Sequence, residues 1–410
     1  MCNKVLSYSL SLNNMRCVMV FLAWFIAIGI YIICGILYLQ FPQLSPLGAL
    51  AYTDTVGDVI MVVSTGVVGV FLGYFAFSKI KLAGIKDFNN SCFINFCSVC
   101  FIISAFLIFA LGVAAYGGYI AFLHTPYIAI YEGSAENQTR DILISSSGLL
   151  ANYALLTSIR VNFKEISITN KVVIAVSLLI LVSIFIQGRR ENLILLILCF
   201  VSFYMLNYKI NFKRIIKVSI ICIIMFFIAG LGLYLRESTS TSGGSIFTAI
   251  PFAVMYETHF SLATLANEVR THLYNNLPYG GVLDLFSPIL FIIPAFIYGI
   301  FGLDKQSLFE NNEMRFYEDK GGQFIFTEAF HSLGYVGVFL HGLILGVMLI
   351  VFYRVAKKSR LIIYHFPIIS LIFVAMRKDL TYGVKYISLL FIFMMIFYFI
   401  YKLLPLKNNG

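Results

Sequence analysis

The sequence predicts an all-α polytopic integral membrane protein with about 11 to 12 transmembrane helices and a large outer loop region. The first observation is composition: 60% of the 410 residues are hydrophobic, 12% are charged, and the mean hydropathy is +0.90. So much apolar surface exceeds what one aqueous core can bury, and hydrocarbon is its natural solvent. The second observation is a series of long apolar stretches. The third is that Lys and Arg gather in short connections between them.

Each long apolar stretch is expected to cross the bilayer as a helix. A span needs about 17 to 25 apolar residues, and in lipid its backbone groups must be hydrogen-bonded within the segment. The expected spans are residues 16–39, 57–77, 97–123, 142–158, 171–187, 192–207, 216–234, 284–302, 334–353, 361–376 and 386–404. The first is too long for the apolar part of a signal peptide and has no small-residue cleavage site after it, so we expect it to be retained.

The basic residues indicate how the spans are oriented. Four alternate connections carry clusters of Lys and Arg, which are Lys79, Lys81, Lys86, Arg160, Lys164, Lys171, Lys209, Lys213, Arg214, Lys217, Arg354, Lys357, Lys358 and Arg360. By the positive-inside rule these connections and both termini are cytoplasmic. Because the net charge of +10 is divided among connections and forms no single patch, a nucleic-acid partner is not expected.

Composition divides the chain into three sections. Residues 1–234 form an N-terminal bundle of about seven spans, residues 235–333 are rich in loops and ionisable side chains, and residues 334–410 hold the closing spans. The orientation rule places residues 235–333 on the outer side of the membrane, which excludes most enzymes that use cytosolic nucleotides. Residues 245–267 are either a further crossing or a re-entrant element, because the region must cross the membrane twice or not at all.

Two adjacent arginines stand between the fifth and sixth expected spans. Arg189 and Arg190 lie in the run QGRRENL, at an outer boundary of the membrane. Guanidinium groups form planar, bidentate hydrogen bonds with phosphate and stay charged, so the pair is a candidate diphosphate site. The alternative is that both side chains reach the lipid head groups and set the depth of the two helices.

The loop-rich section holds the candidate general bases. Glu257 and His259 stand two residues apart, and Glu268, Arg270 and His272 follow at the same spacing. Alternate residues share a face only in extended backbone, so on a helix each run presents only part of its set to a site. His and Glu are common general bases. The alternative is that these histidines are hydrogen-bonding residues of an interfacial aromatic belt.

Two further groups lie beside the late spans. Glu328 and His331 are three apart and share a face at the start of a helix, where Glu328 is either catalytic or a favourable charge at the helix N-terminus. Arg377 and Lys378 lie on the outer side against the positive-inside rule, which suggests an anionic ligand. Neutralisation by Asp379 is the alternative for this pair.

Three segments resemble the bacterial oligosaccharide repeat-unit polymerases, the O-antigen polymerase (Wzy-type) family. They are GRRENLILLIL, LPYGGVLDLFSPILFIIPAFIYG and GGQFIFTEAFHSLGYVGVFLHGLILG, and the matching residues are Gly188, Arg190, Pro278, Gly280, Pro294, Glu328, Phe330, Gly334 and Gly337. The likeness covers about Gly188 to the C-terminus. The chain departs from the family pattern at Ala295, where Arg is common, and at Glu191, where a small residue is common.

The resemblance implies a fold of the lipid-linked-sugar glycosyltransferase (GT-C-like) type in the bacterial inner membrane, with a cavity open to the periplasm. It implies a substrate carried on undecaprenyl diphosphate and a chain-length regulator protein as partner, in surface polysaccharide and lipopolysaccharide synthesis. It implies no nucleotide sugar, no cofactor and no metal. In keeping with this, the sequence has no Walker phosphate loop, no dinucleotide-binding glycine pattern and no HExxH zinc pair.

Such a polymerase transfers a growing glycan from its lipid diphosphate to a sugar hydroxyl of an incoming repeat unit. The hydroxyl needs a base, for which the candidates are His259, Glu257, His272 and Glu328. The departing diphosphate needs positive charge, for which the candidates are Arg189, Arg190, Arg270 and Arg377. Candidate aromatic platforms for sugars are Tyr279, Phe286 and Tyr317. The alternatives are an O-antigen ligase of the same fold and a lipid-linked oligosaccharide flippase or other transporter.

Overall fold

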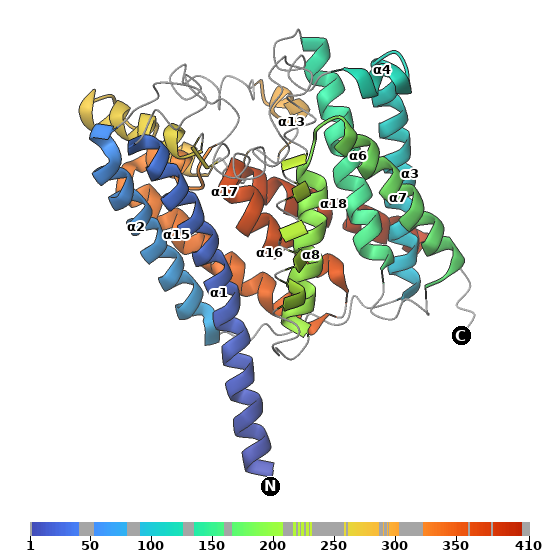
Figure 1. Ribbon diagram of the computed structural model, residues 1–410, viewed down its shortest axis with the longest axis horizontal. Helices are drawn as coiled ribbons and strands as arrows, with labels where there is room; N and C mark the ends of the chain where they lie inside the picture. Colours follow the sequence, from blue (N-terminus) through green and yellow to red (C-terminus); the bar gives the residue numbers. More distant parts are fainter. Residues whose placement is uncertain are drawn as a thin grey trace. The chain divides into compact units, whose positions relative to one another are not determined.

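In the computed structural model, the described residues form helices and the turns that join them (Figure 1). These residues are 2–40, 53–79, 91–125, 135–159, 166–207, 258–259, 261–286, 295–302, 323–359, 361–378 and 380–403, with short pieces between 216 and 231 and positions 290 and 293. The only β-type pairing among them is an isolated bridge between Gln323 and Lys378. The predicted all-α class is confirmed.

Six of the described helices are long and apolar enough to cross a membrane. They are α1 (Cys2–Gln40), α2 (Val56–Ala76), α3 (Ser91–Ala115), α7 (Ile168–Ile186), α15 (Thr327–Lys358) and α18 (Leu380–Leu403). A shorter apolar helix, α8 (Glu191–Asn207), coincides with the expected span at 192–207. Each of these helices overlaps one of the apolar stretches that the sequence predicts as a span, as expected for a polytopic protein.

One expected span is interrupted by glycines. The stretch 97–123 is helical as α3 as far as Ala115, and the short helix α4 (Tyr119–His124) follows after a turn. Gly117 and Gly118 in this turn have φ of 85° and 120°. Residues with a Cβ rarely adopt such angles, so these two glycines end the helix where hydropathy alone predicts that it continues.

Other expected spans are helical but differ in length or polarity. The helix α6 (Ala135–Ser158) covers the expected span 142–158 but carries Arg140, Asp141 and Asn152, and it is not among the six long apolar helices. The stretch 361–376 is a run of four short helical pieces, η6 (Ile362–His365), α16 (Phe366–Ile369), η7 (Ser370–Val374) and α17 (Ala375–Lys378). The described parts of 284–302 include only the short helices α11 (Val282–Leu285) and α13 (Ala295–Ile300).

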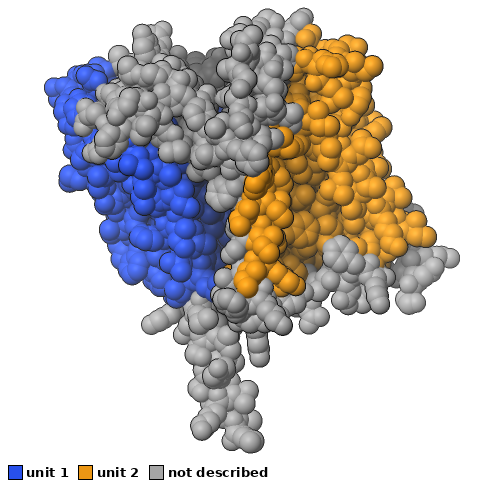
Figure 2. Space-filling view, in the orientation of Figure 1, with its two compact units in different colours: residues 1–84, 254–355, 367–388 blue, residues 85–253, 356–366, 389–410 orange. Residues whose placement is uncertain are grey.

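The chain packs as two compact units (Figure 2). Unit 1 comprises residues 1–84, 254–355 and 367–388, and unit 2 comprises residues 85–253, 356–366 and 389–410. The two units alternate along the chain, whereas the three predicted sections follow chain order. Segments distant in sequence therefore meet within each unit.

Glycines bring α2 and α15 together in unit 1, where the two helices lie side by side (Figure 1). A Cβ added at Gly73 would overlap the carbonyl oxygen of Leu343, and one added at Gly346 would overlap that of Val70. The backbones thus touch where a larger residue would separate them. Small residues at such contacts are typical of helix packing in membranes, where dispersion forces between close backbones replace the hydrophobic effect.

Unit 2 is built around the helices α3, α6 and α7, which pack against one another (Figure 1). Aromatic side chains fill its interior: the ring centroid of Phe101 lies 5.4 Å from that of Tyr153 and 4.9 Å from that of Phe397, and Tyr153 lies 5.0 Å from Phe366. These three pairs of rings meet edge to face, bury apolar area and gain from favourable quadrupole geometry. The polar helix α6 is shielded inside this packing, and its residues 147–158 are all buried.

Candidate functional site

Residues 261–274 of unit 1 supply two side chains of the candidate site. Residues 261–269 are α-helical and continue into a π-helical turn, η5 (Arg270–Tyr274). Glu268 and His272 are four residues apart and therefore lie on one face. Both are buried, with exposed fractions of 2% and 6%. A carboxylate and an imidazole withdrawn from water together require partners, which the rest of unit 1 provides.

The helix α15 supplies the third side chain, His331, from a first turn that is separated from the rest of the helix. The backbone leaves helical geometry just after this turn, where Gly334 has φ of 60° and ψ of −139°. The carbonyl oxygens of His331 and Ser332 accept hydrogen bonds from the N–H groups of Gly280 and Gly281, both at 2.9 Å. A continuous helix uses such carbonyls internally. The break therefore attaches the loop at residues 279–281 to the site.

Glu268, His272 and His331 meet in a compact triangle, which we call the Glu268 cluster. Glu268 Oε2 lies 3.0 Å from His331 Nδ1 and 3.3 Å from His272 Nε2. The two imidazoles are joined by a distance of 3.2 Å between His272 Nε2 and His331 Nδ1. Among the residues that the structure describes, these form the group of three His, Cys, Asp or Glu side chains close enough together to hold one metal ion.

The cluster shifts the ionisation of Glu268 and His272. Burial opposes ionisation of Glu268, but hydrogen bonds with His272 and His331 outweigh it and lower the pKa of the carboxyl group. Burial likewise opposes the charge on His272, but the hydrogen bond with Glu268 outweighs it and raises the pKa of the imidazole. The electrostatic environment therefore favours a negative carboxylate with positive charge beside it.

A backbone carbonyl determines the tautomer of His272. His272 Nδ1 lies 3.0 Å from the carbonyl oxygen of Leu277, and since a carbonyl only accepts, Nδ1 carries the hydrogen. In the neutral imidazole, Nε2 then presents its lone pair to the Glu268 cluster. The ring is held in orientation by Tyr279, which stacks on it with centroids 4.6 Å apart and planes at 18°.

Asp284 extends the cluster on its other side. Its Oδ2 lies 3.8 Å from His331 Nε2, and its side chain is buried. Gly280 makes this approach possible: a Cβ at this position would overlap Asp284 Oδ2 and lie 2.9 Å from His331 Nε2. The glycine that the family resemblance singles out is therefore required here by close packing.

One exposed aromatic side chain, Tyr279, borders the cluster, and a second, Tyr274, ends η5. Tyr279 is 40% exposed and contacts His272, while Tyr274, two residues beyond His272, is 47% exposed. The hydroxyl of Tyr274 donates to Asp58 Oδ2 at 2.9 Å and to the carbonyl oxygen of Asp54 at 3.1 Å. Exposed tyrosines beside a buried acid–base group provide flat apolar faces with polar edges, which suit the faces of sugar rings.

The predicted base candidates separate in the structure. His272 lies in the Glu268 cluster. His259 is 1% exposed and Glu257 lies outside the described residues. Glu328 is in the first turn of α15, where its Oε2 accepts a hydrogen bond of 2.6 Å from Thr381 Oγ1. That bond joins α15 to the start of α18, so Glu328 has a structural partner in unit 1.

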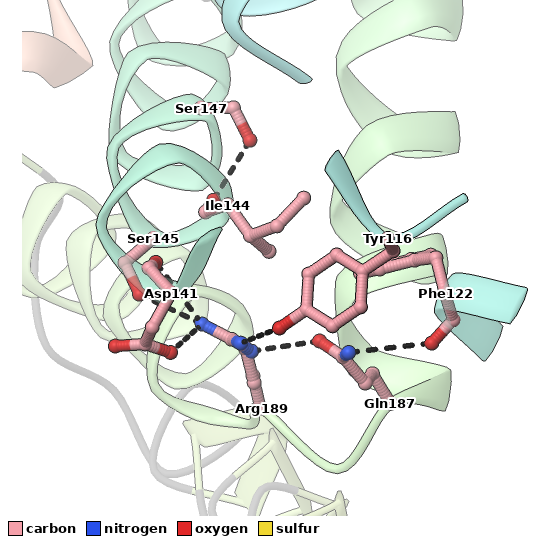
Figure 3. Close-up of polar contacts among 8 residues, drawn as sticks. All are labelled: Tyr116, Phe122, Asp141, Ile144, Ser145, Ser147, Gln187 and Arg189. Atoms are coloured by element: carbon pink, nitrogen blue, oxygen red, sulfur yellow. Dashed lines mark hydrogen bonds and ion pairs between the residues drawn. The ribbon is translucent and has the colours of Figure 1, made fainter. Parts of the chain in front are cut away.

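Arg189 is surrounded by protein partners in unit 2 (Figure 3). It forms an ion pair with Asp141, donates to Ser145 Oγ at 2.9 Å and to Gln187 Oε1 at 2.8 Å, and lies 3.5 Å from the hydroxyl of Tyr116. Gln187 in turn donates to the carbonyl oxygen of Phe122 at 3.3 Å. Arg189 thereby joins the turn between α7 and α8 to α6 and to the end of α3.

The other predicted arginines occupy three different settings. Arg190 is 7% exposed and precedes α8, where its carbonyl oxygen accepts a hydrogen bond of 3.1 Å from Ile194. Arg270 is exposed on η5, two residues before His272. Arg377 is partly buried in α17, and its carbonyl oxygen accepts a hydrogen bond of 3.1 Å from Gln323. Arg270 and Arg377 belong to unit 1, together with the Glu268 cluster, and Arg190 belongs to unit 2.

Three residues of the site are not in the final set of four base candidates: Glu268 and His331, which the sequence had singled out, and Asp284, which it had not. The signal for Glu268 was its four-residue spacing from His272, which places both on one helical face. The spacing of His331 pointed to Glu328 as its neighbour, and Asp284 carries no local signal. They join the cluster because α15 and the loop at 279–281 are hydrogen-bonded to each other.

Comparison with known protein families gave a match that covers nearly the whole chain. The family model described as O-antigen polysaccharide polymerase Wzy matches residues 1–409. The chain belongs to the Wzy family. Searches of the curated proteins and of the solved structures returned no match. The family predicted from three segments between Gly188 and the C-terminus is thus confirmed, and the match extends to the residues before Gly188 as well.

Membership of the Wzy family agrees with the fold. The chain is a multi-pass membrane protein with an O-antigen polymerase role, and its activity is of the glycosyltransferase type on a lipid-linked oligosaccharide in the membrane. For a Wzy protein, a buried group of carboxylates and imidazoles bordered by tyrosines is suitable chemistry, since sugar transfer to a hydroxyl needs proton acceptors beside a sugar-binding surface.

Proposed function

We propose that this Wzy protein joins repeat units carried on undecaprenyl diphosphate at the periplasmic face of the bacterial inner membrane, and that the Glu268 cluster with Asp284 is its catalytic centre. The observation that carries the proposal is the triangle of Glu268, His272 and His331, with edges of 3.0, 3.3 and 3.2 Å, buried within the region that the positive-inside rule assigns to the outer side. The same rule makes both termini cytoplasmic.

The reaction is a substitution at the anomeric carbon of the growing glycan. The oxygen of an acceptor hydroxyl forms a bond to this carbon, and the bond from the carbon to the diphosphate oxygen breaks with its electron pair leaving on undecaprenyl diphosphate. The hydroxyl proton passes to the catalytic centre, whose carboxylates and imidazoles are all proton acceptors. Tyr274 and Tyr279 are suited to hold the sugar rings beside it.

The departing diphosphate, which already carries two negative charges, gains one more in a poorly solvated place and needs cationic partners. Arg270 and Arg377 belong to the same unit as the Glu268 cluster. On its own chemistry we also propose Arg190, of unit 2, as a phosphate ligand, because a guanidinium keeps its charge even when buried and binds phosphate oxygens in pairs. Arg189, with its four side-chain partners, we assign to holding the turn that presents Arg190.

Deletion and restoration of the gene test the function. The host's lipopolysaccharide is separated on a gel with the gene intact, deleted and restored, and a chain-length regulator is expected to set the length of the restored ladder. Core bearing a single repeat in the deletion strain, with a ladder on restoration, supports polymerisation. Core without any repeat contradicts it and favours the ligase or the flippase.

A further inference from the structure

The three donor atoms of the Glu268 cluster have the spacing of metal ligands. The edges of their triangle measure 3.0, 3.3 and 3.2 Å. Imidazole nitrogen and carboxylate oxygen bind zinc at about 2.0 to 2.2 Å, so two such ligands at a tetrahedral angle are about 3.3 to 3.5 Å apart. The triangle is thus close in size to one face of a zinc coordination tetrahedron.

With neutral imidazoles, the contact between His272 Nε2 and Glu268 Oε2 has no hydrogen-bond donor. Since Leu277 receives the hydrogen of His272 Nδ1, the neutral ring faces the cluster with the lone pair of Nε2. Glu268 Oε2, 3.3 Å away, also presents lone pairs. Two acceptors at this distance repel each other unless a positive species lies between them. That species is either a proton on His272 or a cation bound by all three side chains.

His272 has the surroundings of a metal-binding histidine, and His331 has a carboxylate near its second nitrogen. Such a histidine donates its second N–H to a carbonyl or a carboxylate, which orients the ring and strengthens the ligand. His272 has this partner in the carbonyl of Leu277, at 3.0 Å from Nδ1. His331 has a candidate in Asp284, whose Oδ2 lies 3.8 Å from Nε2. Gly280 is the residue whose missing side chain leaves room for that carboxylate.

We propose that Glu268 Oε2, His272 Nε2 and His331 Nδ1 bind one divalent transition-metal ion of the zinc class. Two imidazoles and one carboxylate suit zinc and its first-row neighbours better than Mg²⁺ or Ca²⁺, which prefer oxygen ligands. Three protein ligands leave a fourth position open, as in catalytic zinc sites. The inference departs from the family resemblance, which implies no metal.

The chemical role of the ion rests on the proposed function. With the acceptor hydroxyl as fourth ligand, the ion lowers the pKa of that hydroxyl. Glu268, His272 and His331 are then occupied as ligands, and Asp284 is the remaining acceptor of the catalytic centre for the proton. The bonds formed and broken at the anomeric carbon are those described above.

Metal content tests the binding site without reference to activity. The full-length protein is purified in detergent without a histidine tag, incubated with Zn²⁺, freed of unbound ion and analysed by mass spectrometry. We expect about one equivalent of zinc per chain in the wild type, and at least a tenfold loss in His272→Ala and His331→Ala. The matched control is His341→Gln, which changes a buried histidine of α15 that hydrogen-bonds to Leu285 outside the cluster; it should retain the zinc.

A second measurement uses only the wild type, so that poor folding of a variant leaves no ambiguity. Co²⁺ is titrated into protein treated with a chelator. Visible absorption bands of a four- or five-coordinate site, displaced by Zn²⁺, support the proposal. Wild-type protein that takes up no zinc and shows no such bands overturns it.

The two proposals can fail separately. Zinc bound by wild-type protein in a host whose lipopolysaccharide ladder does not depend on the gene leaves the metal site standing and contradicts the proposed function. A gene-dependent ladder with a metal-free protein does the reverse.

Discussion

Glu268 and His331 are 63 residues apart in the chain, yet Oε2 of the carboxylate lies 3.0 Å from Nδ1 of the imidazole. Both side chains are buried, and His272 completes the triangle from the same helical segment as Glu268. The pair connects the 261–274 segment to the first turn of α15. Whatever fills this triangle, proton or metal ion, also joins these two parts of unit 1.

Replacing Glu268 should abolish polymerisation. In Glu268→Gln the side chain keeps its size but loses the negative charge that both histidines face, and we expect polymer synthesis to fall by about 10² to 10⁴-fold. The measurement is the lipopolysaccharide ladder of a deletion strain carrying the variant, normalised to membrane protein level. His341→Gln at equal protein level should give the full ladder. A normal ladder from Glu268→Gln would remove the cluster from the reaction.

A single methyl group at Gly280 should disturb the site. Its Cβ overlaps Asp284 Oδ2 and crowds His331 Nε2, so Gly280→Ala is expected to displace Asp284 and to lower polymerisation at least tenfold. The matched control is Gly299→Ala, since a Cβ at Gly299 meets nothing within 4 Å. Ladder intensity and mean chain length are compared for the two. Equal ladders would show that the position of Asp284 does not matter.

Arg189 and Arg190 should respond differently to Lys. Lysine cannot reproduce the several directed hydrogen bonds of Arg189, so Arg189→Lys should lower the free energy of unfolding of the detergent-solubilised protein by about 1 to 3 kcal/mol. Arg190→Lys should unfold nearly as the wild type but lose polymer, because it retains the charge and loses the bidentate geometry. A full ladder from Arg190→Lys would mean that this arginine only anchors its helix.

The contact between α2 and α15 should tolerate no larger residue. Gly73→Val places a side chain against the backbone at Leu343 and should lower the melting temperature of the solubilised protein, with a loss of about 1 to 3 kcal/mol. In Gly57→Val, on the same helix, the first added atom meets nothing within 4 Å, and its melting temperature should stay near that of the wild type. Equal melting of the two variants would contradict the close packing.

A variant that lacks the hydrogen bond between Thr381 and Glu328 distinguishes a structural role of Glu328 from a catalytic one. Thr381→Val removes the hydroxyl that donates to Glu328 Oε2 at 2.6 Å and keeps the shape of the side chain. If Glu328 acts through this bond, Thr381→Val and Glu328→Gln should lower stability by similar amounts, about 1 to 3 kcal/mol, in thermal unfolding. A ladder lost in Glu328→Gln but intact in Thr381→Val would instead return Glu328 to the catalytic candidates.

Hydropathy and charge along the chain were sufficient to predict the membrane class and most of the long helices, and the resemblance of three segments indicated the family. These properties depend on neighbours in sequence: a stretch of apolar residues must be helical in lipid whatever it packs against. Hydropathy alone was wrong about the helix expected at 97–123. Gly117 and Gly118 adopt positive φ angles there, so α3 ends inside the expected span.

The site depended on the tertiary structure. From the sequence, Glu268, Arg270 and His272 were described by their two-residue spacing. In the helix, Glu268 and His272 are instead neighbours, because residues four apart share a face. His331 reaches them only because Gly334 breaks α15 and frees its first turn to bind the loop at residues 279–281. Packing between segments distant in the sequence determines which buried ionisable side chains come into contact. A local sequence pattern does not contain that information.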